Sequence, residues 1–249
     1  MTDLPSEPDH AQPRRILIVG DSNCLPRRDV KYRASWIYLL KQSLPGDDFI
    51  VLADGGRTTE FLAQNPKVHP DGGIEYDPSS LEIYEPSIVI LNLGIVDCAP
   101  RMFRKIESQV IGRLPNSLMK LVIAIARKLR RRRLDRTYVS TTAFEANAHQ
   151  YLDRCVAAGV EHMIIIGIPT ADLRGMRKNP LLRQAAATYN SIWARLASEI
   201  KGAIFLDPLH PEQDISILYE ADGYHLSLHG HLVLFRTIAA ALHPGPGSQ

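Results

Sequence analysis

The pattern of apolar residues along the chain contains five short continuous runs, and none of them alternates polar with apolar positions. Continuous runs of this length are typical of strands that are buried on both faces, as they are in a parallel sheet. We therefore expect strands at Ile16–Val19, Phe49–Leu52, Ser87–Leu93, His162–Ile166 and Ala203–Leu206.

Helical segments separate these runs, so that strand and helix alternate along the chain. This alternation is the pattern of a doubly wound α/β fold. We predict a three-layer α/β/α sandwich around a five-stranded parallel sheet with the flavodoxin-like strand order 2-1-3-4-5. Right-handed crossovers would bring the carboxyl ends of all strands to one edge, where such sheets bind ligands. The expected helices are Ser35–Ser43, Thr59–Gln64, Phe144–Ala158, Leu181–Lys201 and His229–Leu242.

One connection is too long for this pattern, because more than sixty residues separate Asp97 from His162. A crossover helix with its loops needs far fewer residues. We interpret about 100–139 as a partly helical insertion that projects from the ligand-binding edge as a lid. Residues 14–243, with this insertion included, are expected to form a single domain, and the two ends, 1–13 and 244–249, are expected to be disordered tails.

Composition narrows the class of protein. The chain has 249 residues, 45% of them hydrophobic, and a net charge of +2, so no overall field favours nucleic acid. No apolar run approaches the ~18 residues of a membrane span, and the polar N-terminus lacks the apolar core of a secretory signal. The three cysteines indicate neither a disulfide framework nor a CxxC zinc motif. We expect a cytoplasmic protein with no metal and no other cofactor.

Two short segments contain candidate catalytic residues. Ser22 follows the first predicted strand, where its hydroxyl and its amide would reach the ligand-binding edge. Asp222 and His225 stand three residues apart, just before the last predicted helix. A serine nucleophile needs a base, and the base needs a group that orients it. These residue types together indicate a serine hydrolase.

Four motifs, in order along the chain, resemble those of the SGNH, or GDSL-type, hydrolase family. The resemblance extends from Ile16 to about Leu242, whereas the GxSxG, Walker and GxGxxG motifs of other enzyme classes are absent from the sequence. The four motifs are Gly20–Ser22, Gly56–Thr59, Gly94–Asp97 and Asp222–His225.

The resemblance implies a role for each matching residue. Ser22 would be the nucleophile, His225 the general base and Asp222 the carboxylate that orients the imidazole. The amides of Ser22 and Gly56 would form part of the oxyanion hole, with Gly55 as the alternative register.

The third motif departs from the family pattern at Val96, where the family usually has an asparagine that donates to the oxyanion. Loss of one such donor typically lowers the rate about 10²–10³-fold. Asn23, Arg57 and Asn92 are candidate replacements and candidate substrate-binding residues. Asp97 matches the acidic residue of the motif; we count it with the substrate-binding candidates and expect it to support the loop.

The resulting hypothesis is a serine esterase that removes an O-acyl group, such as acetyl, from a carbohydrate or another ester related to the cell envelope. One alternative is an O-acyltransferase with the same triad, and another is a non-catalytic glycan-binding protein on a decayed hydrolase fold. Cys24 is either an alternative nucleophile or a small thiol that packs in the interior.

A basic run from Arg127 to Arg133, with Arg136 beyond it, follows the apolar stretch Leu118–Ala126. Three interpretations are open: a solvated basic face, a site for an anionic ligand, or contact of 118–136 with the anionic inner face of a membrane. Nucleic acid is not expected as a partner, because no aromatic residues interleave with the basic ones. The sequence does not indicate an oligomeric state.

Overall fold

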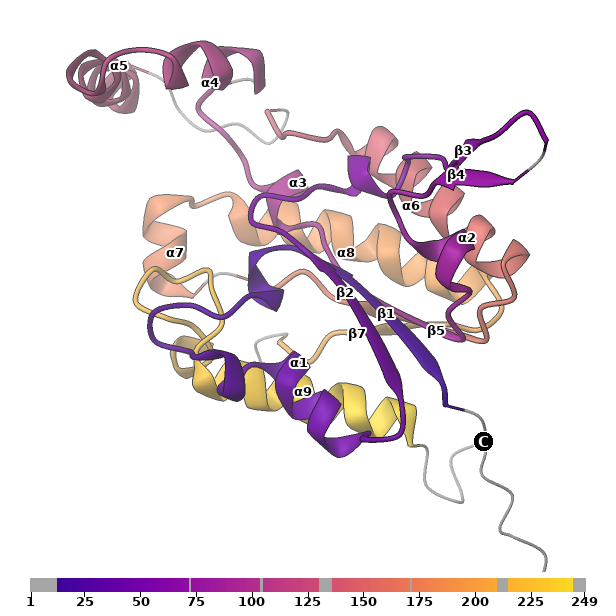
Figure 1. The fold of residues 1–249 in the computed structure, drawn as a ribbon. Helices are drawn as coiled ribbons and strands as arrows, with labels where there is room; N and C mark the ends of the chain where they lie inside the picture. The colour runs from indigo at the N-terminus through magenta and orange to yellow at the C-terminus, as the bar shows by residue number, and fades with distance from the viewer. Residues whose placement is uncertain are drawn as a thin grey trace, which may run out of the picture.

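The structure is a computed structural model, and it describes residues 13–71, 73–103, 105–129, 136–170, 172–209 and 215–243. Five parallel strands form the central sheet in the order β2-β1-β5-β6-β7 (Figure 1). This is the predicted order, 2-1-3-4-5. Apart from Pro13, the two predicted tails lie outside the described residues. The strands are β1 (Arg15–Gly20), β2 (Asp48–Ala53), β5 (Ile88–Asn92), β6 (His162–Ile166) and β7 (Ala203–Leu206).

Helices cover both faces of the sheet and complete the three-layer sandwich (Figure 1). In β1, Ile16 and Ile18 pack in the core that contains α1 and α9, whereas Leu17 and Val19 pack in the core that contains α6 and α8. All four side chains are fully buried. A strand covered on both faces therefore needs an apolar residue at every position. The covering helices are α1 (Trp36–Ser43), α6 (Thr141–Ala157), α8 (Leu182–Glu199) and α9 (Leu228–Leu242).

The structure differs from the prediction in its shorter elements. The helix expected at Thr59–Gln64 is only a 3-10 turn, η3 (Thr59–Phe61), and Pro66 just beyond it disfavours helical backbone. Other elements are too short to show a periodic pattern and were not predicted. They are β3 (Lys67–Val68), β4 (Ile74–Tyr76), α2 (Leu81–Tyr84), α3 (Ile95–Cys98), α7 (Leu173–Lys178), η1 (Ser22–Cys24), η2 (Tyr32–Ala34) and η4 (Ile215–Leu218).

The expected insertion contains two helices, α4 (Lys105–Gly112) and α5 (Asn116–Leu129), which stand away from the sheet beyond α3 (Figure 1). On α5, the side chains of Leu118, Leu121 and Ile125 are exposed. Most of the basic run lies outside the described residues, so the membrane contact expected for 118–136 stays a prediction. Within the described residues, no helix is both long enough and apolar enough to span a bilayer.

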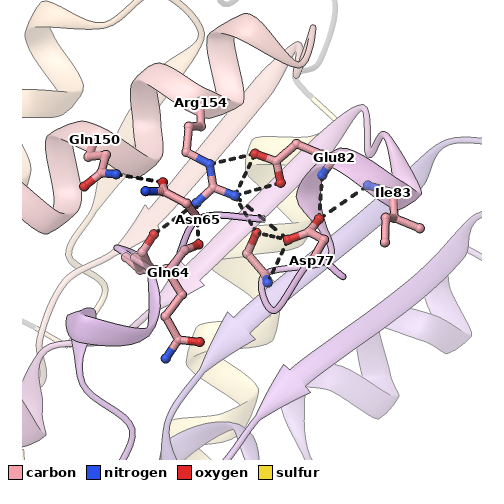
Figure 2. A network of polar contacts seen from close by, with 9 residues as sticks. Gln64, Asn65, Asp77, Glu82, Ile83, Gln150 and Arg154 are labelled. Atoms are coloured by element: carbon pink, nitrogen blue, oxygen red, sulfur yellow. Dashed lines mark hydrogen bonds and ion pairs between the residues drawn. The ribbon is translucent and has the colours of Figure 1, made fainter. Parts of the chain in front are cut away.

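A group of polar contacts, here called the Arg154 network, joins α6 to the chain around α2 (Figure 2). The Arg154 guanidinium donates to both carboxylate oxygens of Glu82 at 2.6 and 2.7 Å, to the Gln64 carbonyl at 2.9 Å and to the Ser79 hydroxyl at 2.9 Å. Asp77, which is buried, accepts hydrogen bonds from the amide and hydroxyl of Ser79 at 2.9 and 2.7 Å. The guanidinium therefore connects α6 both to the chain at Gln64 and to the segment from Ser79 to Glu82, and its donors are used within the protein.

Candidate active site

Ser22 is placed at the carboxyl end of β1 by a tight turn. Asp21 caps this turn, because its Oδ1 accepts the Asn23 amide at 2.9 Å, while the Asp21 amide donates to the Asn92 carbonyl of β5 at 3.1 Å. The Asp21 carboxyl is buried, and this burial raises its pKa to about 7 in spite of the hydrogen bond from Asn23. Ser22 therefore begins η1 on a rigid support between two central strands.

Asp222 and His225 belong to a turn that precedes α9. Asp222 Oδ1 accepts the amides of Tyr224 and His225 at 2.9 and 3.0 Å, and Oδ2 lies 2.6 Å from His225 Nδ1. Burial acts to raise the pKa of Asp222, but these hydrogen bonds outweigh it and hold the pKa at about 2. The carboxylate is therefore ionised near neutral pH and fixes the orientation of the imidazole.

Gly223 makes the close packing of this turn possible. Its φ is +78°, and a Cβ atom at this position would lie 2.3 Å from the Gly175 amide nitrogen of α7. Only glycine combines this backbone conformation with such a close approach. The Tyr224 hydroxyl donates to the Gly175 carbonyl at 3.0 Å, and this hydrogen bond holds the turn against α7.

The two ends of the chain meet at Ser22 and His225, which are 203 positions apart in the sequence. Ser22 Oγ lies 3.0 Å from His225 Nε2. Beside this contact, the Leu226 amide donates to Asn23 Oδ1 at 3.3 Å. With a proton on Nδ1 shared with Asp222, Nε2 is free to accept the hydroxyl proton of Ser22, which is the arrangement a serine nucleophile needs.

A cavity of about 1000 Å³ opens beside this pair. Ser22, Tyr224 and His225 line it together with residues from two segments, 95–102 and 178–182. The first segment begins the insertion, and the second connects α7 to α8. None of the described side chains of α4 and α5 is among those that line the cavity.

The oxyanion hole expected from the sequence involves two amides and Val96. Gly56 lies in the turn after β2 with a φ of +81° and with open space where a Cβ would stand. Within the described residues, neither the Ser22 amide nor the Gly56 amide donates to another protein group. Val96 lines the cavity, so an apolar side chain occupies the position of the usual asparagine donor.

The three candidate replacements for that donor do not line the cavity. Asn23 is buried, and its side chain accepts the Leu226 amide, so we assign it a positioning role in place of a substrate contact. Arg57 donates to the Leu52 carbonyl and lies over the Phe61 ring at 4.0 Å. Asn92 is buried at the end of β5.

Asp97 is fully buried and ties the third motif to η3. Its Oδ1 accepts the Thr59 amide at 2.9 Å and the Thr59 hydroxyl at 2.6 Å, and its carbonyl accepts the Tyr138 amide at 3.2 Å. Burial raises the pKa of this carboxyl to about 6, against the effect of the Thr59 hydrogen bonds. These contacts fit the expected loop support and leave no direct path from Asp97 to a substrate in the cavity.

Cys24 is a poor alternative to Ser22 as a nucleophile. Its side chain is buried, does not line the cavity, and has a pKa that burial raises well above the usual value, so the reactive thiolate is disfavoured. His231, on α9, is also buried, and its Nδ1 accepts the Trp36 amide at 3.3 Å. No cluster of three or more potential metal ligands occurs in the described parts of the chain.

Sequence reasoning did not predict the polar side chains of Arg101, Lys178, Asn179 and Tyr224 in the cavity lining. Arg101 lies where the chain leaves the sheet for the insertion, and Lys178 ends a six-residue helix. Neither position carries a periodic pattern or a motif. Tyr224 lies within the fourth motif, and its position between Asp222 and His225 could have predicted that its side chain lies near the site.

Comparison with known proteins gives matches at the level of structure. No family model and no curated protein sequence matches the chain. TesA superimposes with a TM-score of 0.57 and 16% identity, covering 93% of this chain and 99% of TesA. A lipase/acylhydrolase from Enterococcus faecalis gives 0.56 and 17%, covering 95% and 100%. A catalytic mutant of Axe2, an acetylxylan esterase from Geobacillus stearothermophilus, gives 0.55 and 16%, covering 90% and 92%. The chain thus has the fold of SGNH hydrolases, as the resemblance of its four motifs led us to expect.

Proposed function

We propose that this protein is a carboxylic ester hydrolase with Ser22 as its nucleophile. The observation that carries the proposal is the continuous contact from Ser22 Oγ through His225 to Asp222, with distances of 3.0 and 2.6 Å, at the edge of a large cavity. Solved structures with the same fold include a lipase/acylhydrolase and an acetylxylan esterase, which supports ester chemistry.

In the proposed mechanism, Ser22 Oγ attacks the ester carbonyl while its proton passes to His225 Nε2. The amides of Ser22 and Gly56 stabilise the negative charge that develops on the carbonyl oxygen. The tetrahedral intermediate then expels the alcohol, which takes the proton from His225, and leaves an acyl group on Ser22. Water, deprotonated by His225, releases the acid and restores the hydroxyl. Asp222 stays ionised throughout and stabilises the transient imidazolium.

The substrate class that we propose is an O-acylated carbohydrate or a related ester of the cell envelope. Two structures of similar fold are described as an acetylxylan esterase and as a carbohydrate esterase family 2 enzyme, and this supports a sugar ester. The cavity of about 1000 Å³ has room for a substrate group much larger than acetyl.

The test is hydrolysis of p-nitrophenyl acetate by the wild type and two variants, Ser22→Ala and Cys24→Ala. We expect Ser22→Ala to lose the activity and Cys24→Ala to keep most of it, with circular dichroism used to check that both are folded. Activity that survives Ser22→Ala would reject the nucleophile, and loss in Cys24→Ala alone would transfer the role to the thiol. Formation of an acylated sugar in place of free acid, when a sugar acceptor is added, would identify a transferase.

A further inference from the structure

The cavity beside Ser22 has an uneven charge distribution. Its apolar lining comes mainly from the segments 95–102 and 178–182, and the side chains with a full positive charge that line it, among the described residues, are Arg101 and Lys178. No aspartate or glutamate from the described parts of the chain lines it. The chain as a whole is nearly neutral, with 29 basic and 27 acidic residues, so this excess of positive charge is a local property of the cavity.

Arg101 is held in position by groups other than carboxylates, as far as the described residues extend. Its guanidinium lies 4.3 Å from the centre of the Tyr138 ring, and Nη2 donates to the Val96 carbonyl at 3.4 Å. Its Nε is buried and has no hydrogen-bond partner among the described residues. A guanidinium whose hydrogen-bonding capacity is only partly used within the protein can still donate to a ligand.

Lys178 lies on the opposite segment. Its Nζ donates to the Asp222 carbonyl at 3.0 Å and lies 5.6 Å from the centre of the Tyr224 ring. No ion pair joins Lys178 to a carboxylate within the described residues. Asn179, which is buried, donates to the Pro100 carbonyl at 3.1 Å and so ties the Lys178 segment to the residue next to Arg101.

We propose that the ester substrate carries an anionic group, a carboxylate or a phosphate, which Arg101 and Lys178 bind while Ser22 attacks the ester carbonyl. A guanidinium in a partly apolar cavity binds an anion more strongly than it would in open solvent, because water screens it less. Lys178 is exposed, and its ammonium adds a second positive charge at the opposite segment. This inference rests on the proposed hydrolase activity and narrows its substrate class from esters in general to anionic esters.

The test compares pairs of esters that differ in charge. On the alcohol side, 4-acetoxybenzoate is paired with its neutral methyl ester, and 4-acetoxyphenyl phosphate is paired with its neutral dimethyl phosphate triester. On the acyl side, the mono-p-nitrophenyl ester of adipate is paired with its neutral methyl ester. For each pair, kcat/KM of the anionic ester is divided by kcat/KM of the neutral one. The arm with the largest ratio then identifies which anion the cavity takes and on which side of the ester.

We expect the wild type to prefer the anionic member of at least one pair, and Arg101→Met to lower that ratio about ten- to hundredfold, as loss of a charged hydrogen bond would. Lys178→Met should lower it less, and Arg101→Lys should retain part of it. Arg177→Met is the matched control, because Arg177 is the neighbouring cation on α7 and does not line the cavity; it should keep the ratio.

Two results would overturn the inference. The first is Ser22-dependent hydrolysis of the neutral esters with no preference for an anion in any pair, which would leave the proposed function intact. The second is an equal loss for both members of a pair in Arg101→Met, which would make Arg101 an oxyanion donor or a support of the fold. Failure of the proposed function itself has a different signature, because no ester of either charge would then be hydrolysed through Ser22.

Discussion

Arg154 and Arg101 differ in how completely the protein satisfies their guanidinium groups, and this difference separates a residue that stabilises the fold from one that can bind a ligand. Arg154 donates to a carboxylate, a hydroxyl and backbone carbonyls in the Arg154 network, and its side chain is 15% exposed (Figure 2). Arg101 lies over a tyrosine ring with one long hydrogen bond and with no carboxylate partner in the described parts of the chain. A satisfied guanidinium acts as a brace within the protein, whereas an unsatisfied one beside a nucleophile is available to a ligand.

The buried carboxyl groups of the two regions also differ, in the direction in which their pKa values are shifted. In the Arg154 network, burial acts to raise the pKa of Asp77, but hydrogen bonds from Ser79 and Glu82 prevail and lower it. In the candidate active site, Asp21 and Asp97 are so buried that their pKa values rise to about 7 and about 6. The comparison predicts that changes near the cavity alter activity more than stability, and that changes in the Arg154 network do the reverse.

The largest effect on activity is expected from His225→Gln. Without a base at Nε2, Ser22 loses its proton acceptor, and kcat/KM for p-nitrophenyl acetate should fall by at least about 10³-fold. His229→Gln is the matched control, because His229 is an exposed histidine four residues along the chain. The melting temperatures of the two variants should stay close to that of the wild type. Comparable activity in His225→Gln and in the control would remove His225 from the mechanism.

The largest effect on stability is expected from Arg154→Met. This change leaves Glu82 and the buried Asp77 without their cation. The Arg154–Glu82 pair is partly buried, with side chains 15% and 21% exposed, so its loss should cost about 1–3 kcal/mol. Chemical denaturation would measure the loss, and the folded fraction should keep the kcat/KM of the wild type. Arg195→Met, which breaks only exposed ion pairs with Glu145 and Glu199, should have a much smaller effect. Equal destabilisation by both variants would contradict the special role of the network.

A smaller change, in the opposite direction, is expected from Val96→Asn. An amide at this position would add a donor to the oxyanion hole and should raise kcat about tenfold, less than the full 10²–10³-fold value of a well-placed donor. Val96→Ala is the control for the change in cavity shape. No gain in Val96→Asn would mean that another group already supplies the donor.

The smallest effect is a pH dependence of stability that differs between the two regions. Carboxyl groups in unfolded chains titrate near pH 4. Because Asp21 and Asp97 have higher pKa values in the folded state, folding takes up protons, and stability should fall as pH rises from about 4 to 7. Asp222, with a pKa of about 2, and Asp77 have lowered values, so their stabilisation is present above about pH 4 and is lost as pH falls below it.

Melting temperatures measured between pH 3 and pH 8 would separate these contributions. Asp97→Asn should flatten the fall between pH 4 and pH 7, whereas Asp77→Asn should weaken the loss below pH 4. A melting temperature of the wild type that is constant from pH 4 to pH 7 would contradict the raised pKa values of the two buried carboxyl groups.

Much of the fold could be predicted because apolar runs buried on both faces leave a clear signature in the sequence. The run Ile16–Val19 marks β1 without ambiguity, and the glycine of Asp222–His225 reflects a backbone conformation and a close approach that other residues do not tolerate. The meeting of Ser22 with His225 followed from the order of the strands together with the resemblance of the motifs.

The side chains that surround the site could not be predicted in the same way. Asn23 follows the first motif and Arg57 lies within the second, but the direction of each side chain is set by a contact outside the motif, with the Leu226 amide and the Phe61 ring respectively. Arg101 reaches the cavity because Tyr138, far along the chain, holds its guanidinium. Contacts of this kind leave no pattern in a single sequence.

The most direct test of the central claim is the reaction of the folded protein with a fluorophosphonate probe, followed by peptide mass spectrometry. The account predicts one adduct, on Ser22, which His225→Gln abolishes. A folded protein that is not modified, or that carries the adduct on another residue, would contradict it.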